Sequence, residues 1–80
     1  MTITTAVAKR IDEYLFSRGI TLYKLAKDAC IPVASLQNLY RGTTKTPTLA
    51  LLCKLCVGLG VSLPEFFDSP LFTSAELELD

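Results

Sequence analysis

The sequence predicts an all-α protein with one small domain of five short helices. Apolar residues recur at spacings of three and four along most of the chain, which is the period of an amphipathic helix. Gly, Pro and capping hydroxyl residues divide these stretches into short segments. With 80 residues, of which 50% are hydrophobic and 20% charged, the chain has material for one core and is too apolar to be disordered.

The first two helices are predicted from their spacing and their caps. The first covers residues 5–17 and ends at Gly19. Its apolar residues are Val7, Ile11, Tyr14 and Leu15. The second covers residues 22–29, and the hydroxyl of Thr21 is a suitable N-cap for it. Its inward residues are Leu22, Leu25, Ala26 and Ala29.

A sharp turn over residues 30–32 separates the second helix from the third. Pro32 has no backbone N–H and disfavours helical geometry at Ile31, so the second helix must end before it. The third helix covers residues 33–41, and Gly42 ends it because glycine adopts left-handed dihedrals without strain. Its inward residues are Leu36 and Leu39.

The fourth and fifth helices complete the predicted domain. Thr46 as N-cap and Pro47 as first residue begin the fourth helix, which ends at Gly58 and Gly60. Its expected apolar face consists of Leu49, Leu52, Cys53, Cys56, Val57 and Leu59. Ser62 and Glu65 stand in capping-box register and start a short fifth helix. It carries Phe66 and Phe67. We therefore expect a domain over residues 1–68 and an acidic tail over residues 69–80, whose order the pattern does not decide.

Charge is distributed unevenly although the formal net charge is zero. All 8 basic residues lie at or before Lys54, together with only three of the 8 acidic residues. Such an asymmetry indicates a basic part that can face a polyanion and an acidic part that faces away from it, unless the charges are merely solvated.

Cysteine number and the N-terminal sequence predict a cytoplasmic protein. The three cysteines, Cys30, Cys53 and Cys56, are an odd number that does not make a disulfide framework, so we expect reduced thiols. The first residues lack the features of a secretory signal, and no run of about 18 apolar residues is available to span a membrane.

The second and third helices, with their short turn, match the helix-turn-helix pattern. Ala26 must be small where the two helices cross. The sequence resembles the Cro/repressor family, also called the XRE family, in residues 21–26, 31–39, 41–42, 47–55 and 59–63. This resemblance implies a five-helix bundle of the lambda-repressor-like type that binds double-stranded DNA as a transcriptional regulator, commonly a repressor and commonly a homodimer.

The resemblance also implies which residues contact DNA. The third helix would enter the major groove, and its base-contacting positions are Val33, Ala34, Ser35, Gln37 and Asn38. An amide such as that of Asn38 can pair with adenine through two hydrogen bonds. The expected phosphate contacts are Thr21, Tyr23, Arg41, Thr43, Thr44 and Lys45.

Several positions depart from the family pattern. Cys30 stands where family members usually carry a glycine in a left-handed turn. Pro32 replaces a Ser or Thr, so the third helix loses a side-chain cap. Leu15 and Tyr40 stand where many members have an Arg–Glu ion pair, and we expect these two side chains to pack together.

Other functions find little support in the sequence. The chain has no histidine, no phosphate-binding glycine loop and no nucleophile beside a base, so we predict no enzyme activity and no cofactor. The two cysteines of Cys53-Lys54-Leu55-Cys56 are expected in the core and not on a metal. No small-molecule ligand is indicated.

Two alternatives concern surfaces. The same fold can serve as a protein-interaction module or antitoxin-like partner, with Val33, Ala34, Tyr40, Phe66, Phe67, Leu71 and Phe72 as contacts. For a homodimer, Phe67, Leu71 and Phe72 are the expected interface, unless these residues close the core of the monomer.

Overall fold

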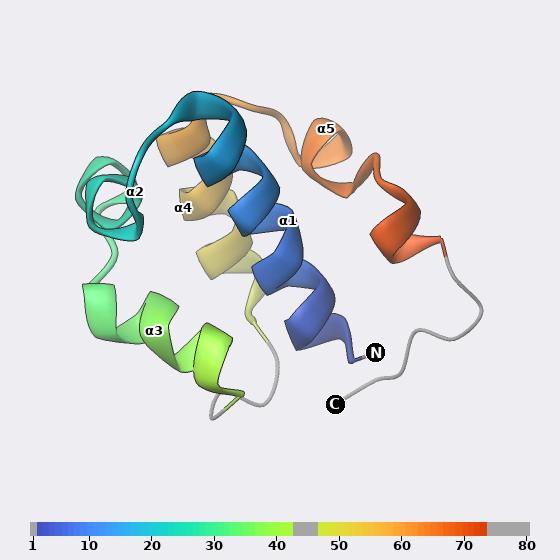
Figure 1. The fold of residues 1–80 in the computed structure, drawn as a ribbon, viewed down its shortest axis with the longest axis horizontal. Helices are drawn as coiled ribbons and strands as arrows, with labels where there is room; N and C mark the ends of the chain where they lie inside the picture. Colours follow the sequence, from blue (N-terminus) through green and yellow to red (C-terminus); the bar gives the residue numbers. More distant parts are fainter. Residues whose placement is uncertain (1, 43–46, 74–80) are drawn as a thin grey trace.

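The computed structural model describes residues 2–42 and 47–73, and it confirms the all-α fold (Figure 1). The helices are α1 (Ile3–Arg18), α2 (Leu22–Ala29), α3 (Val33–Arg41), α4 (Leu49–Leu59), α5 (Leu63–Phe67) and the short 3-10 helix η1 (Pro70–Phe72). In Figure 1, α1 crosses in front of α4, α2 and α3 lie on the left, and α5 lies on the right. Within the described ranges, no helix has the length and apolar character needed to cross a bilayer.

Hydroxyl caps explain where the helices begin. In α1, α2, α4 and α5 the residue before the helix accepts a hydrogen bond, through its side chain, from the backbone N–H three positions later. These caps are Thr2, Thr21, Thr48 and Ser62. The predicted capping box is confirmed, because the Glu65 carboxylate also accepts from the Ser62 N–H at 3.1 Å.

The predicted start of α4 was wrong by about one half-turn. Thr48 and not Thr46 is the N-cap, since the Thr48 hydroxyl accepts from the Leu51 N–H at 3.1 Å, and Pro47 lies outside the helix. Thr46 lies outside the described residues. The helix also continues through Gly58 to Leu59, and Gly60 ends it with a φ of 71°.

The buried face of α4 also differs from the predicted one. The buried residues are Leu52, Leu55, Cys56 and Leu59, which follow the i, i+3, i+4, i+7 spacing of a single face. Leu49, Cys53 and Val57 were expected inside but are exposed. Because almost every residue of α4 is apolar, the pattern alone does not define which side faces the core.

One glycine permits close packing of α4 against α2. A Cβ placed on Gly58 would lie 2.7 Å from the Ala29 Cβ and 3.0 Å from the Ala29 Cα and N. Carbon atoms in van der Waals contact are about 3.5–4.0 Å apart, so only a residue without a side chain fits here. Gly58 therefore sets the distance between α4 and the end of α2.

Aromatic residues close the core beside α5. The buried Phe66 ring lies 5.2 Å from the Phe67 ring and 6.1 Å from the Phe72 ring, and Phe67 and Phe72 meet edge to face at 4.8 Å. Phe67 and Phe72 thus pack on the monomer core, as in the alternative to the dimer interface expected for Phe67, Leu71 and Phe72. Leu71 is half-buried and is not among the residues packed on that core.

Arg10 joins α1 to α5. Its guanidinium donates to the Phe66 carbonyl at 2.7 Å and to the Glu65 carbonyl at 2.8 Å. It also lies over the Tyr14 ring, with 4.6 Å between the guanidinium carbon and the ring centroid. The last carbonyl groups of a helix have no N–H donor from a following turn. The Arg10 guanidinium supplies hydrogen-bond donors to two of these carbonyl groups at the end of α5.

Candidate nucleic-acid interface

The turn between α2 and α3 has a fixed backbone geometry. Cys30 has a φ of 57° and a ψ of 43°, which confirms the left-handed conformation expected at this position. The Ile31 N–H donates to the Ala26 carbonyl at 2.9 Å and the Cys30 N–H to the Lys27 carbonyl at 3.3 Å, which is a Schellman motif. Glycine occupies the equivalent left-handed position after α1, α3 and α4, so Cys30 carries a steric cost that the other three ends avoid.

A hydrophobic seam holds α3 in place beneath its outer face. The predicted inward residues of this motif are all buried: Leu25, Ala26, Ile31, Leu36 and Leu39. They join a single core cluster with residues of α1, α4 and α5. The packing of these side chains, and not a capping interaction at either end of the helix, therefore fixes the orientation of α3.

The outer face of α3 carries the predicted base-contacting residues. Ala34 is exposed, the other four residues of this set are half-buried, and none of the five is buried. At about 100° per residue, Ala34, Gln37, Asn38 and Arg41 share the side opposite Leu36 and Leu39. The other two residues lie at the flanks: Val33 packs against the core cluster and Ser35 lines a groove.

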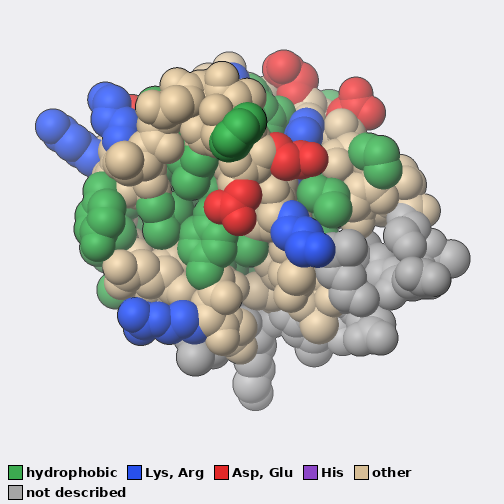
Figure 2. All heavy atoms as spheres, viewed as in Figure 1, with side chains coloured by type: hydrophobic (Ala, Val, Ile, Leu, Met, Phe, Trp, Pro, Cys, Tyr) green, Lys and Arg blue, Asp and Glu red, His purple; other side chains and the backbone are tan. Residues whose placement is uncertain are grey.

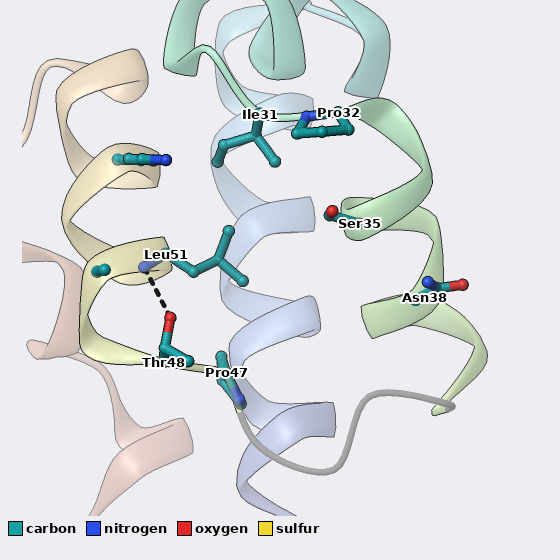
Figure 3. Close-up of a pocket in the computed structure, with 9 residues that line it drawn as sticks. Ile31, Pro32, Ser35, Asn38, Pro47, Thr48 and Leu51 are labelled. Carbon is teal, nitrogen blue, oxygen red and sulfur yellow. Dashed lines mark hydrogen bonds between the residues drawn. The ribbon is translucent and has the colours of Figure 1, made fainter.

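That groove runs between α3 and α4 and has a volume of about 340 Å³ (Figure 3). It is lined by Ile31, Pro32, Ser35, Asn38, Pro47, Thr48, Ala50, Leu51 and Lys54. In Figure 3, Ser35 points from α3 toward α4, and the dashed line marks the Thr48 cap of α4. Lys54 therefore stands across the groove from the polar residues of α3, a neighbour that sequence reasoning missed.

The predicted phosphate contacts are only partly described. Thr21 accepts from the Lys24 N–H as the cap of α2, and Tyr23 is exposed in the first turn of that helix. Arg41 is exposed at the end of α3. Thr43, Thr44 and Lys45 lie outside the described residues.

Basic residues accompany this surface. Residues 22–59 include five basic residues, Lys24, Lys27, Arg41, Lys45 and Lys54, and a single acidic residue, Asp28. Asp28 forms an ion pair with Lys24 at 3.1 Å. On the face shown in Figure 2, Lys and Arg side chains project at the left edge, over α2 and α3, whereas toward the centre and upper right acidic side chains stand beside further Lys and Arg side chains. The side that carries α2 and α3 is thus the one suited to a polyanion.

Tyr40 ties α3 to α1. Its hydroxyl donates to the Asp12 carboxylate at 2.9 Å. Burial, the hydrogen bond to Asp12 and the charge of Asp12, in that order, raise the pKa of Tyr40 well above its usual value. Asp12, the partner of Tyr40, lies about one turn before Leu15 in α1, and Leu15 packs against the core cluster. The expected contact between Leu15 and Tyr40 stays a prediction.

The cysteines occupy three different environments. Cys56 is buried, and burial, followed by the neighbouring Cys53, raises the pKa of its thiol. Cys53 is exposed, which corrects the expectation that both cysteines of α4 lie in the core. Cys30 is exposed at the turn before α3. Within the described residues, no three cysteine or acidic side chains gather in a group that could hold a metal ion.

Two crossed helices with a short fixed turn, a buried seam and an outward polar edge define a helix-turn-helix DNA-binding domain. The sequence profile of the Cro/C1-type helix-turn-helix DNA-binding domain matches residues 10–70, and the chain belongs to this family. Neither the comparison with curated proteins nor that with solved structures gave a match.

Proposed function

We propose that the protein is a sequence-specific regulator of transcription that inserts α3 into the major groove of double-stranded DNA. The observation that carries this proposal is the orientation of α3, with Leu36 and Leu39 in the core and Gln37, Asn38 and Arg41 on the opposite side. A helix of this width fits the major groove, where the edges of all four base pairs can be distinguished.

Each residue of the outer edge has its own part in reading the bases. Asn38 pairs with an adenine through N6 and N7, and Gln37 makes the same kind of contact at a neighbouring base pair. Ala34 and the exposed part of Val33 offer apolar contacts to thymine methyl groups. Ser35, at the margin of the groove, donates to or accepts from a base edge.

Phosphate contacts flank this edge on both sides. The exposed first turn of α2, with Thr21 and Tyr23, presents backbone N–H groups and a positive dipole end to one strand. Arg41 contacts the phosphate backbone beyond the other end of α3, and so do Thr43, Thr44 and Lys45, which follow it in the sequence. Lys54 joins this set, because it lies on the groove beside α3.

In this proposal the protein represses by occupying its site. The competing interpretation, a protein-interaction module, was based on seven apolar residues, of which the core already uses four and leaves out Ala34, Tyr40 and Leu71. Phe66 is completely buried, and Val33, Phe67 and Phe72 pack against the core cluster. The apolar set therefore does not form one docking surface, whereas the polar residues of α3 share one outward side.

Selection of duplexes from random DNA, followed by titration at several salt concentrations, tests the proposal. We expect selected duplexes to share a motif and their affinity to fall steeply with salt, because each neutralised phosphate releases a counterion. Failure of the folded protein to bind any duplex at low salt would refute it.

Variants separate base reading from phosphate binding. Asn38→Ala should weaken binding by a factor corresponding to about 1–3 kcal/mol and relax the preference at one base pair. Lys54→Ala should weaken binding to all duplexes alike and reduce the salt dependence by about one phosphate. Asp68→Asn is the control, because it also changes the net charge by one unit. Asp68 follows α5, which lies on the other side of the molecule from α3 (Figure 1), so the salt dependence of DNA binding should not change.

A further inference from the structure

The groove between α3 and α4 has the size of a site for a small organic molecule. Its volume of about 340 Å³ falls in the range of ligand sites in proteins, roughly 300–1,000 Å³. At about 30 Å³ of liquid volume for each water molecule, this space corresponds to roughly ten non-hydrogen atoms. The groove therefore suits a ligand of about that size, and not a peptide or a folded partner.

The middle of the groove is apolar and its ends are rigid. Ile31 is buried at the turn before α3, and the half-buried Leu51 extends from α4 toward α3 (Figure 3). Pro32 and Pro47 stand at the two ends of the groove, and a proline ring fixes its own backbone φ. The Thr48 cap holds the first turn of α4 in place. A groove with such walls exists before a ligand arrives, so binding requires little ordering of the protein.

The charge around the groove is positive. Residues 29–64 contain three basic residues and no acidic residue, and all the residues that line the groove belong to this stretch. Lys54 is exposed on the α4 side of the groove. Within the residues that the structure describes, Lys54 forms no ion pair. The Ser35 hydroxyl and the Asn38 amide stand about one turn apart on α3 and line the opposite wall. An anionic group is thus the favoured polar part of a ligand.

We propose that this groove binds a small organic monocarboxylate. The carboxylate lies between Lys54 on one wall and Ser35 and Asn38 on the other, which together supply one positive charge and several hydrogen-bond donors. The apolar body of the ligand lies along Ile31 and Leu51 and shields their surface from water. One ammonium group balances one negative charge, whereas a phosphate monoester carries nearly two at neutral pH. A carboxylate is therefore the better match.

The consequence, which rests on the proposed function, is that the ligand and DNA compete. Lys54 and Asn38 are both assigned to the DNA contact, one to a phosphate and one to a base. A carboxylate bound between them withdraws the charge and the amide from DNA, so the ligand acts as an inducer that releases the protein from its site. Because a ligand of about ten atoms makes few contacts in an open groove, we expect a dissociation constant of about 0.1–10 mM.

NMR titration of the isotope-labelled full chain tests the site without DNA. The probes are hydrocinnamate and isocaproate, an aromatic and an aliphatic monocarboxylate. We expect saturable shifts of amide signals at groove residues such as Ser35, Asn38 and Leu51, and none in α5. Hydrocinnamide has the same body without the charge and should bind about two- to fivefold more weakly than hydrocinnamate. Acetate lacks the apolar body and should bind at least about tenfold more weakly. No saturable shift with either probe up to about 30 mM, or equal binding of hydrocinnamide, would overturn the proposal.

Substitutions on α4 show whether the ligand lies in the groove. Ala50 is exposed and lines the groove, so Ala50→Leu fills that space without changing the core and should raise the dissociation constant for hydrocinnamate at least about tenfold. The matched control is Cys53→Leu, at an exposed position of α4 that does not line the groove, and it should bind as the wild type does. Lys54→Met should weaken binding about two- to fivefold and abolish the preference for hydrocinnamate over hydrocinnamide. Circular dichroism verifies that each variant is folded. Wild-type binding by Ala50→Leu, or an equal loss in Cys53→Leu, would contradict this site.

Competition with a selected duplex tests the regulation separately, at an ionic strength held constant with chloride. With hydrocinnamate at about ten times its dissociation constant, the affinity of the wild type for DNA should fall about tenfold, and that of Ala50→Leu should not respond to the ligand. Ligand binding with undiminished DNA affinity would refute the competition. A chain that binds hydrocinnamate but no duplex would refute the proposed function and support the groove site. A chain that binds DNA but neither carboxylate would do the reverse.

Discussion

Substitution of Gly58 by alanine tests the close packing of α2 against α4. The added Cβ would approach the Ala29 Cβ to 2.7 Å and two backbone atoms of Ala29 to 3.0 Å. Backbone atoms do not move aside by changing a rotamer, so the helices must separate by roughly 1 Å to restore ordinary contact. Overpacking costs about 1–3 kcal/mol, and a clash with backbone atoms lies in the upper part of that range, at about 2–3 kcal/mol. The higher helix propensity of alanine offsets about 1 kcal/mol of this cost.

We therefore expect Gly58→Ala to lower the free energy of unfolding by about 1–2 kcal/mol. For a domain of this size that corresponds to a fall in Tm of about 4–16 °C. Urea and thermal unfolding followed by circular dichroism measure the change. Ala50→Gly, at an exposed position of the same helix, gives the local difference in propensity between alanine and glycine.

A double-mutant cycle with Ala29→Gly shows whether the clash is the cause. Removal of the Ala29 side chain eliminates the closest contact, so Gly58→Ala should cost about 1 kcal/mol less in that background. If Gly58→Ala were as stable as the wild type, or if the two substitutions were simply additive, the packing described for α2 and α4 would be refuted.

Four further substitutions or measurements follow from the structure. Arg10→Met should lower the free energy of unfolding by about 2–3 kcal/mol in urea unfolding, because carbonyl groups of α5 lose a charged donor, whereas Lys9→Met on the exposed side of α1 should change it little. Cys30→Gly should raise the same quantity by about 0.5–1 kcal/mol, since glycine removes the left-handed strain but adds freedom to the unfolded chain; a destabilised variant would argue against this turn. The raised pKa of Tyr40 means that its contribution to stability is complete below about pH 10 and is lost as the pH rises further, because the unfolded chain ionises first. Between about pH 10 and 11 the wild type should therefore lose more stability than Tyr40→Phe, by at most ~1 kcal/mol because the ring is partly exposed. In the native protein a thiol reagent should label Cys30 and Cys53 quickly and Cys56 only after unfolding, and rapid labelling of all three would contradict the burial of Cys56.

The helix-turn-helix could be predicted to the residue because its boundaries depend on local chemistry. The observed bounds of α2 and α3 agree with the predicted ones, since Thr21, Pro32 and Gly42 each act within a few residues of their own position. The left-handed conformation of Cys30 was predictable for the same reason, from the turn that the motif requires.

The features that escaped prediction depend on contacts between distant residues or on competing local signals. Thr46 and Thr48 both offer caps for α4, and its almost entirely apolar sequence does not select a buried face, so tertiary packing decides both. The bonds of Arg10 to α5 and of Tyr40 to Asp12 join residues 56 and 28 positions apart, which no periodicity reveals. Lys54 became a candidate contact only when the structure placed it across the groove from Asn38.

The hydrogen bonds of Arg10 bear on where a tag or a second protein can be fused to this domain. A junction before Glu65 would remove the carbonyls that the guanidinium satisfies and leave a mostly buried cation beside the exposed edge of the core. A junction just after Phe67 would also disturb Ser69, which is buried and caps the turn that brings Phe72 onto the aromatic cluster. Fusion partners attached beyond Thr73 would leave these contacts intact, and their linkers would start on the side of the molecule away from α3 (Figure 1).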